Sequence, residues 1–194
     1  MGTMDLGKLL EESGAILRGH FVLTSGRHSD VYFEKFRVLE QPRVLSALCE
    51  KIAEHFRDQG IDIVAGPLTG GIIIAFEVAR QLGCNAVYVE SEGGVKMLRR
   101  GASVPAGARV LVVDDVLTTG KSIHEVLSVM RNSKAVPVGV GVLISRSEGQ
   151  PDFGCPCFAA HRVEARSWAP EEVPDWLAAI PAVKPGTRPN VCGR

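Results

Sequence analysis

The chain has 194 residues, 45% of them hydrophobic and 23% charged, a composition typical of a globular protein of about one domain with a sizeable core. Its formal net charge is zero, so it lacks the general basic field that nucleic-acid binding proteins carry. The longest apolar run, around Gly70–Val78, is far shorter than the ~20 residues that a membrane span requires. We therefore expect neither a nucleic-acid partner nor a membrane partner.

The cysteines and the first residues point to the cytoplasm. The cysteine count is five, an odd number, which is typical of reduced thiols. Residues Met1–Gly7 lack the basic region and apolar run of a signal peptide. Zinc binding by Cys155, Cys157 and His161 is disfavoured, because no second ligand pair stands at a finger-like spacing.

The N-terminal third combines helical and strand-like segments. Apolar spacing predicts a short helix over Leu6–Leu17. Two strand-like runs, His20–Leu23 and Val31–Phe36, flank a Thr-Ser-Gly turn and predict a hairpin or a small separate ribbon. A second helix is expected over Val44–Phe56, after Pro42.

The middle of the chain alternates strand and helix. Strands are expected at Ile61–Ala65, Ala86–Val89, Arg109–Val113 and Pro137–Ile144, and helices at Ile72–Leu82 and Ile123–Met130. This alternation predicts an α/β fold, with a central parallel sheet flanked by helices on both faces. Ligands of such sheets bind beyond the carboxyl ends of the strands.

Two regions fall outside this alternation. About twenty residues rich in glycine and charge separate Val89 from Arg109, and a loop of that length is usually functional or mobile. Towards the C-terminus, one more strand near Phe158–Val163 and a short helix near Glu171–Ile180 are expected. Val183–Arg194 is rich in proline, glycine and basic residues and is expected to be a frayed tail.

The most informative segment is Val110–Ser122, where a strand ends at Asp114 and Asp115 and a Thr-Thr-Gly turn opens a helix. A helix N-terminus binds anions, and Gly120 allows the backbone to approach a phosphate closely. Carboxylates cannot hold phosphate, so their natural partners are vicinal sugar hydroxyls or a magnesium ion. The segment thus predicts a site for ribose 5-phosphate, with further hydroxyl donors at Thr118, Thr119 and Ser122.

Two other interpretations of this segment were weighed. A nucleotide-binding P-loop is excluded, because Asp115 stands where that motif requires glycine and a carboxylate there would repel a triphosphate. The alternative is an ordinary strand followed by a helix capped by Thr119. Paired aspartates before Thr-Thr-Gly are too particular for that interpretation.

The segment resembles the phosphoribosyl diphosphate signature of the type I phosphoribosyltransferases. Three further stretches are similar to the orotate phosphoribosyltransferase family: Gly19–Phe33 to its N-terminal substrate ribbon, Gly66–Gly71 to its diphosphate loop, and Leu143–Arg146 to its late strand ending in arginine. The resemblance implies a type I phosphoribosyltransferase-like central sheet in a single domain over residues 1–194. It also implies a core at about 41–150, a hood formed by about 1–40 with the C-terminal segment, and a tail at 183–194.

The resemblance also implies an activity, the transfer of a 5-phosphoribosyl group from phosphoribosyl diphosphate (PRPP) to orotate in pyrimidine (UMP) biosynthesis. Magnesium would be bound mainly through PRPP, with no dedicated set of protein ligands. The implied PRPP-binding residues are Thr69, Gly70 and Gly71 for the diphosphate, Asp114 and Asp115 for the ribose hydroxyls, Thr118 near the base, and Thr119, Gly120, Lys121 and Ser122 for the 5-phosphate.

Orotate is a planar carboxylate, and the residues expected to bind it are Ser25, Gly26, Tyr32, Phe33, Thr118 and Arg146. Because side chains alternate along a strand, one of Tyr32 and Phe33 is expected to face the core and the other the site. The candidate catalytic residues are Asp114, Asp115 and the loop cations Lys96, Arg99 and Arg100. The alternative for the three cations is a solvated basic stretch without a catalytic role, but the length of the loop favours function. The resemblance further implies a homodimer in which each loop reaches the partner's site.

The sequence departs from the family pattern at three places. Thr24 and Gly70 stand where many members carry lysine, and the loop Glu90–Arg100 holds only three cations. Two alternatives stay open: transfer to another carboxylated or purine base, and a PRPP-sensing regulator that binds DNA or RNA. The ribbon and Arg146 argue against a purine enzyme, and the neutral charge argues against the regulator.

Overall fold

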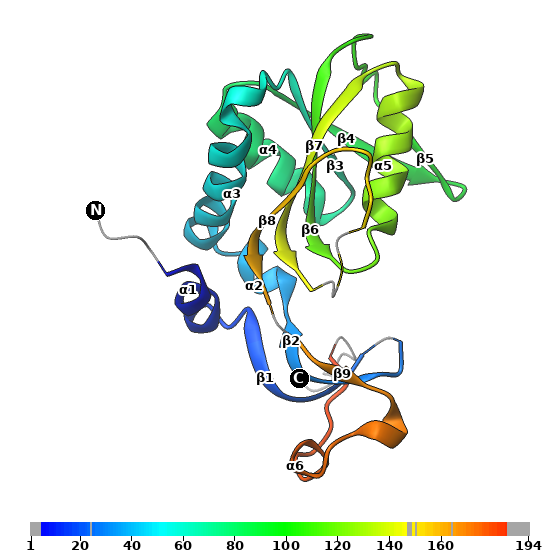
Figure 1. Cartoon of the computed structure of the whole chain (residues 1–194). Helices are drawn as coiled ribbons and strands as arrows, with labels where there is room; N and C mark the ends of the chain where they lie inside the picture. The colour runs from blue at the N-terminus through cyan, green and yellow to red at the C-terminus, as the bar shows by residue number, and fades with distance from the viewer. Residues whose placement is uncertain (1–4, 24, 147–148, 150, 164, 186–194) are drawn as a thin grey trace, which may run out of the picture.

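The protein folds into a large central sheet covered by helices and a small sheet beside it (Figure 1). The computed structural model describes residues 5–23, 25–146, 149, 151–163 and 165–185. Within these residues, no helix has the length and the apolar stretch needed to cross a membrane.

The central sheet has the strand order β5-β4-β3-β6-β7-β8. All neighbouring pairs are parallel except β4 and β5, which are antiparallel. The predicted parallel sheet is therefore confirmed. The strands are β3 (Ile63–Pro67), β4 (Asn85–Glu92), β5 (Val95–Leu98), β6 (Arg109–Leu117), β7 (Val136–Ser145) and β8 (Cys157–Arg162).

Helices cover both faces of this sheet. One face is covered by α3 (Pro42–Phe56) and α4 (Gly70–Leu82), and the other by α5 (Lys121–Asn132) (Figure 1). The short 3-10 helix η1 (Arg57–Gln59) follows α3. Each face has its own apolar cluster, the first including Leu48 and Ile74 and the second Ile123 and Leu127. The nearly continuous burial of β6 and β7 follows from this double cover.

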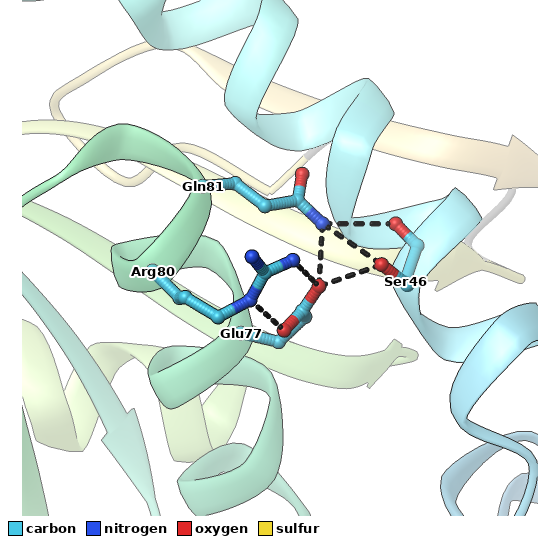
Figure 2. A network of polar contacts seen from close by, with 4 residues as sticks. All are labelled: Ser46, Glu77, Arg80 and Gln81. Atoms are coloured by element: carbon cyan, nitrogen blue, oxygen red, sulfur yellow. Dashed lines mark hydrogen bonds and ion pairs between the residues drawn. The ribbon is translucent and has the colours of Figure 1, made fainter.

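A polar cluster ties α3 to α4 (Figure 2). Glu77 accepts hydrogen bonds from Ser46 Oγ at 2.6 Å and Gln81 Nε2 at 2.7 Å, and Arg80 donates two more to its carboxylate. The hydrogen bonds from Arg80 lower the pKa of Glu77 to about 2, despite the opposing effect of burial. The cluster fixes α4 against α3, and with it the loop that leads into α4.

The small sheet has the order β1-β2-β9 and is antiparallel. It contains β1 (Ile16–Val22), β2 (His28–Phe33) and β9 (Ser167–Trp168). The short helices around it are α1 (Leu6–Glu12), α2 (Lys35–Leu39), η2 (Pro170–Glu172) and α6 (Asp175–Ala178). The hairpin expected from the two N-terminal runs is thus present as β1 and β2.

The C-terminal segment returns to β1. Val183 N donates to His20 O at 2.8 Å and Val183 O accepts from Val22 N at 2.9 Å, while His20 Nδ1 lies 2.9 Å from Ile180 O. Val183 was expected to begin a frayed tail but is bound to the sheet edge. Residues 186–194, the rest of that predicted tail, lie outside the described residues.

Local backbone geometry changes three of the predicted boundaries. The first helix ends at Glu12 instead of Leu17, because Gly14 adopts a left-handed conformation with φ 73° that lets the chain turn into β1. The strand expected to reach Phe36 ends at Phe33, because the Glu34 side chain accepts from Phe36 N and caps α2. The helix expected over Glu171–Ile180 shrinks to η2 and α6.

The stretch after Val89 is a β-hairpin for about half of its length. β4 continues to Glu92 and pairs with β5, and the turn between them is Gly93-Gly94, with φ 57° and 83°. Two consecutive residues of positive φ form the tight turn that suits the twist of a hairpin. The prediction of a long irregular loop was wrong here; the hairpin extends past α5 (Figure 1).

Candidate active site

Two buried aspartates occupy the strand β6. The strand continues to Leu117, so Asp114 and Asp115 lie inside it and not at its end as expected. Asp114 Oδ2 accepts from Ser122 Oγ at 2.5 Å, and Asp115 Oδ2 accepts from Lys35 Nζ at 2.8 Å. Successive side chains of a strand point to opposite faces, so one carboxylate faces α5 and the other faces α2 and α4.

Burial of this carboxylate pair has an electrostatic consequence. Asp114 and Asp115 retain 5% and 8% of their exposed surface. Burial first, and then the charge of Asp115, raise the pKa of Asp114, against the opposing hydrogen bond from Ser122. The pair is thus a site of concentrated negative charge that is suited to hydrogen-bond donors such as sugar hydroxyls.

The turn between β6 and α5 forms an anion-binding helix N-terminus. Gly120 caps α5 with φ 76°, and a Cβ at this position would lie 2.8 Å from Phe153 Cζ, so a side chain fits neither the backbone nor the packing. Thr118 and Thr119 are exposed just before it. Lys121 N donates a long hydrogen bond of 3.5 Å to Thr119 Oγ1, and the start of α5 opens onto this accessible turn.

A glycine loop from β3 to α4 lies against the carboxylate pair. A Cβ at Gly70 would lie 2.5 Å from Asp115 Oδ2, and one at Gly66 would collide with Gly71 O. The Leu68–Thr69 peptide bond in this loop is cis. Because β3 and β6 are neighbouring parallel strands, the N-termini of α4 and α5 lie on either side of the aspartates.

A cleft of about 1110 Å³ separates the central sheet from the small sheet. Its walls combine residues of both parts, among them Ser25, Tyr32, Thr118, Thr119, Arg146 and Ser167. The turn before α5, at Thr118 and Thr119, therefore opens into the same cavity as the predicted base-binding residues Ser25, Tyr32 and Arg146.

Arg146 provides a cation in this cleft. Its backbone N donates to Leu117 O at 2.9 Å and its Nη2 to Val31 O at 3.4 Å. Within the described part of the chain, its buried Nε has no acceptor. Burial lowers the pKa of the guanidinium, and a planar carboxylate in the cleft is the type of partner that would satisfy its remaining donors.

Comparison with known proteins agrees with this geometry. A family model described as a phosphoribosyl transferase domain matches residues 37–153. The orotate phosphoribosyltransferase of Pelotomaculum thermopropionicum is 48% identical over 184 residues, which cover 95% of this chain and 97% of that relative. This chain belongs to the orotate phosphoribosyltransferase family.

Other relatives and solved structures of this family are similar along most of the chain. The orotate phosphoribosyltransferase of Chlorobium phaeobacteroides is 43% identical, covering 94% of each chain. The crystal structure of orotate phosphoribosyltransferase from Aeropyrum pernix superposes with a TM-score of 0.72 and 32% identity, covering 82% of this chain and 94% of that one. An adenine phosphoribosyltransferase from Thermoanaerobacter pseudethanolicus shares the fold, with a TM-score of 0.60 at 18% identity.

The donor-side residues predicted for an orotate phosphoribosyltransferase come together. Thr69, Gly70 and Gly71 lie at the start of α4, and Thr118–Lys121 at the start of α5, on either side of the aspartates. Ser122 differs from the prediction in one respect. Its hydroxyl donates to Asp114 Oδ2 at 2.5 Å, so this donor is already used within the protein.

The acceptor-side residues come together only in part. Ser25, Tyr32, Thr118 and Arg146 line the cleft. Phe33 does not, because it is 5% exposed and packs in the core cluster of the central sheet, as alternation along the strand requires for one of the two aromatic residues. Gly26 lies in the hairpin turn with its N–H donated to Leu23 O at 2.9 Å, so this N–H is not available to a base.

The three predicted loop cations lie on and just after the β4–β5 hairpin. Lys96 Nζ is 3.8 Å from Glu125 Oε2, Arg99 pairs with Glu92 at 3.4 Å, and Arg100 pairs with Glu90 at 3.0 Å. None of the three lines the cleft of its own chain. Each of them pairs with a glutamate, and among the described residues the cation that pairs with the carboxylates is Lys35.

Two residues of the site were not recognised in the sequence. Lys35 binds Asp115, and Arg27 donates to Ser167 O at 2.7 Å and to its Oγ at 3.0 Å, joining the two strands that border the cleft. Arg27 belongs to the Gly19–Phe33 ribbon and Lys35 follows it by two residues, but neither has a spacing that marks it. A partner 80 or 140 positions away gives no local signal.

Proposed function

We propose that this protein transfers the 5-phosphoribosyl group of PRPP to orotate in the cytoplasm, giving orotidine 5′-monophosphate and diphosphate for UMP biosynthesis. One observation carries this proposal above the others. A single cleft joins an anion-binding turn beside buried carboxylates to an arginine whose buried Nε has no acceptor among the described residues. The first part suits a ribose phosphate, and the second suits a planar acid.

On the donor side, Asp114 and Asp115 hold the ribose hydroxyls. The 5-phosphate binds at the α5 N-terminus, through the backbone of Gly120 and Lys121 and the exposed hydroxyl of Thr119. The diphosphate binds at the glycine loop Thr69–Gly71, whose backbone lies close to Asp115, since a Cβ at Gly70 would come within 2.5 Å of its Oδ2. Ser122 acts through Asp114, whose orientation it fixes.

On the acceptor side, Arg146 pairs with the orotate carboxylate, and bidentate geometry makes this contact selective for a planar acid. Tyr32 lines the same cleft and offers its ring for stacking. Thr118 lies between the two halves, near the ring of the base. Uracil, which lacks the carboxylate, would leave the guanidinium unsatisfied.

Catalysis in this site is mainly positioning. Departure of diphosphate leaves positive charge at the anomeric carbon, and the cleft holds the orotate nitrogen next to that carbon. The buried carboxylates stabilise the developing positive charge, and the helix N-termini stabilise the departing anion. The small sheet acts as a hood that excludes water, which competes with the base.

Magnesium fits this site through the substrate. Among the described residues, no group of three or more His, Cys, Asp or Glu side chains could hold a metal ion. The two aspartates are already hydrogen bonded to Ser122 and Lys35. The donor's own diphosphate and hydroxyl oxygens are therefore the proposed ligands, and the ion neutralises charge on the diphosphate.

The hairpin acts across a homodimer in this proposal. Four large apolar side chains on α2, the glycine loop and α4 are 42–60% exposed: Phe36, Leu68, Ile73 and Phe76. Exposed apolar side chains of this size suit an interface, and a two-fold axis there would bring each glycine loop close to the partner chain. Lys96, Arg99 and Arg100 would then reach the partner's diphosphate.

The test of this function is acceptor choice. Purified protein is incubated with PRPP and magnesium and with orotate, uracil or adenine in parallel, and the nucleotide formed is identified by mass spectrometry. Orotate is expected to react about 30- to 150-fold faster than uracil, because a lost charge-assisted contact to Arg146 costs about 2–3 kcal/mol. Preferred formation of a different nucleotide would reject orotate as the acceptor.

A further inference from the structure

Lys35 lies at the junction of the donor and acceptor halves. It begins α2, and its Nζ donates to Asp115 Oδ2 at 2.8 Å. The lysine side chain remains 42% exposed, although that of Asp115 is 12% exposed. The lysine side chain is therefore accessible to solvent, while the carboxylate that it contacts is largely buried.

The same carboxylate oxygen contacts the glycine loop. A Cβ at Gly70 would lie 2.5 Å from Asp115 Oδ2, the oxygen that also accepts from Lys35 Nζ. The glycine at the start of α4 and the ammonium of Lys35 thus lie next to the same carboxylate oxygen. Burial raises the pKa of the Tyr32 hydroxyl, and Lys35 is one of the cations close enough to oppose that rise, which places the lysine towards the acceptor half.

This position needs a positive charge. A diphosphate bound at the glycine loop would stand next to two carboxylates that repel it. Among the described residues, no other cation pairs with Asp114 or Asp115. The cations of the hairpin pair with Glu125, Glu92 and Glu90, and Lys121 belongs to the 5-phosphate turn.

The pKa of Lys35 keeps it available for this task. Burial acts to lower the pKa, but the hydrogen bond to Asp115 and the charges of both aspartates together raise it above its ordinary value. The side chain is therefore protonated in the neutral range. An ammonium carries three donors, and the described contacts use one of them, so a second can bind an incoming oxygen.

We propose that Lys35 is a donor-binding residue whose ammonium contacts the diphosphate of PRPP while it holds Asp115. This inference rests on the proposed function and extends it by assigning the leaving-group contact to a residue of α2. When the bond between the anomeric carbon and the diphosphate breaks, the electron pair stays on the diphosphate oxygen. Lys35 stabilises that charge from within its own chain.

The experiment compares two ligands and four proteins. Calorimetry measures the binding of magnesium diphosphate and, separately, of ribose 5-phosphate to the wild type, Lys35→Met, Lys35→Arg and the control Lys51→Met. Lys51 is an equivalent lysine in an exposed pair with Glu54 on α3, outside the site. We expect Lys35→Met to weaken diphosphate binding about tenfold or more, Lys35→Arg to restore it to within about threefold, and Lys51→Met to change nothing.

Ribose 5-phosphate separates direct contact from an effect through Asp115. Its affinity should stay within about twofold in Lys35→Met, since the hydroxyl-binding carboxylate remains. Equal weakening of both ligands would overturn the proposal, because Lys35 would then act only by orienting Asp115. Unchanged diphosphate affinity would overturn it as well.

Two further measurements keep this test independent of folding and of the proposed function. Melting temperatures report whether each variant folds, and Lys35→Gln, which keeps a donor for Asp115 without the charge, replaces Lys35→Met if the latter is unfolded. Orotate turnover is measured on the wild type alone. Diphosphate binding that depends on Lys35 without orotate turnover would leave the lysine assignment standing and would reject the proposed acceptor.

Discussion

The donor half and the acceptor half of the cleft are built in different ways. The donor half comes mainly from one continuous segment. In it Ser122 Oγ donates to Asp114 Oδ2 only eight positions away, and Gly120 between them caps α5. The acceptor half joins distant segments, since Arg146 bonds Val31 across 115 positions and Arg27 bonds Ser167 across 140. Local chemistry thus fixes the phosphate site, and the packing of the small sheet on the core fixes the base site.

The two halves also carry opposite charge. Buried carboxylates occupy the donor half, and burial raises the pKa of Asp114. A buried guanidinium occupies the acceptor half, and burial lowers the pKa of Arg146. In each half the folded protein holds charge at an electrostatic cost that a substrate group of suitable chemistry relieves.

The largest expected effect comes from breaking the donor half at Asp115. Asp115→Asn should lower kcat/KM about a thousandfold, roughly 4 kcal/mol, because the ribose loses its ionised acceptor and Lys35 loses its partner. PRPP binding measured by calorimetry should be lost, with the melting temperature near that of the wild type. Asp58→Asn, on the exposed helix η1, is the matched control. PRPP affinity equal to that of the wild type would remove Asp115 from the donor site.

Breaking the acceptor half should affect the other substrate. Arg146→Ala should raise the orotate KM about 100-fold while the PRPP KM changes about threefold or less, because a charged contact to the base is worth about 2–3 kcal/mol. Arg146→Lys should lie between the two, since it keeps the charge without the planar fork. Equal increases in both KM values would mean that Arg146 supports the whole cleft and does not select the base.

The β4–β5 hairpin is expected to contribute less to turnover than Asp115 or Arg146, and to act on the site of the partner chain. Arg99→Ala combined with Arg100→Ala should lower kcat about tenfold, with a change in unfolding free energy below about 0.5 kcal/mol, because both ion pairs are at the surface. If the double variant turns over at the wild-type rate, Arg99 and Arg100 are solvated surface charges with no part in catalysis.

A mixed dimer tests whether the hairpin acts across the interface. Subunits carrying Asp115→Asn are mixed with subunits carrying the double arginine change, after dissociation and reassociation. If each hairpin completes the partner's site, a hybrid contains one site with both intact elements and has activity above that of either parent. Hybrids with no activity above that of the parents would assign the hairpin to its own chain.

The smallest effect is on stability and follows from Asp114. Its pKa is raised in the folded state, so its contribution to stability is present below its unfolded pKa and is lost as pH rises through its folded pKa. Asp114→Asn should therefore raise the melting temperature by a few degrees, about 2–4 °C per kcal/mol, at pH 8, and by less at pH 5. Calorimetric melting at both pH values checks this. A gain that grows at lower pH would contradict the proposed cost of ionising Asp114.

The sequence predicted the parallel sheet, and the strand-turn-helix segment proposed to bind the donor, because both depend on local patterns. Buried strands alternating with amphipathic helices defined the layers, and the Asp-Asp-x-x-Thr-Thr-Gly spacing defined the phosphate turn. Phe33 was assigned to the base site because alternation alone does not say which of two adjacent aromatic residues faces the core. The contact of the small sheet with the central sheet decides that.

The remaining differences come from contacts that are distant in sequence or from backbone geometry. Lys35 could not be placed, because its partner lies 80 positions away on β6. The glycine-rich stretch after Val89 suggested an irregular loop, but Gly93 and Gly94 form a hairpin turn. Val183 was assigned to a tail by composition, although the open edge of β1 gives its backbone two hydrogen bonds.

The most direct test of the central claim follows orotate by its ultraviolet absorbance with PRPP and magnesium both present or each omitted. The account predicts that absorbance falls only when both are present, at a rate that Asp115→Asn and Arg146→Ala each reduce. Consumption of orotate without PRPP, or no consumption with both present while PRPP still binds, would contradict the claim that one cleft joins a ribose phosphate donor to orotate.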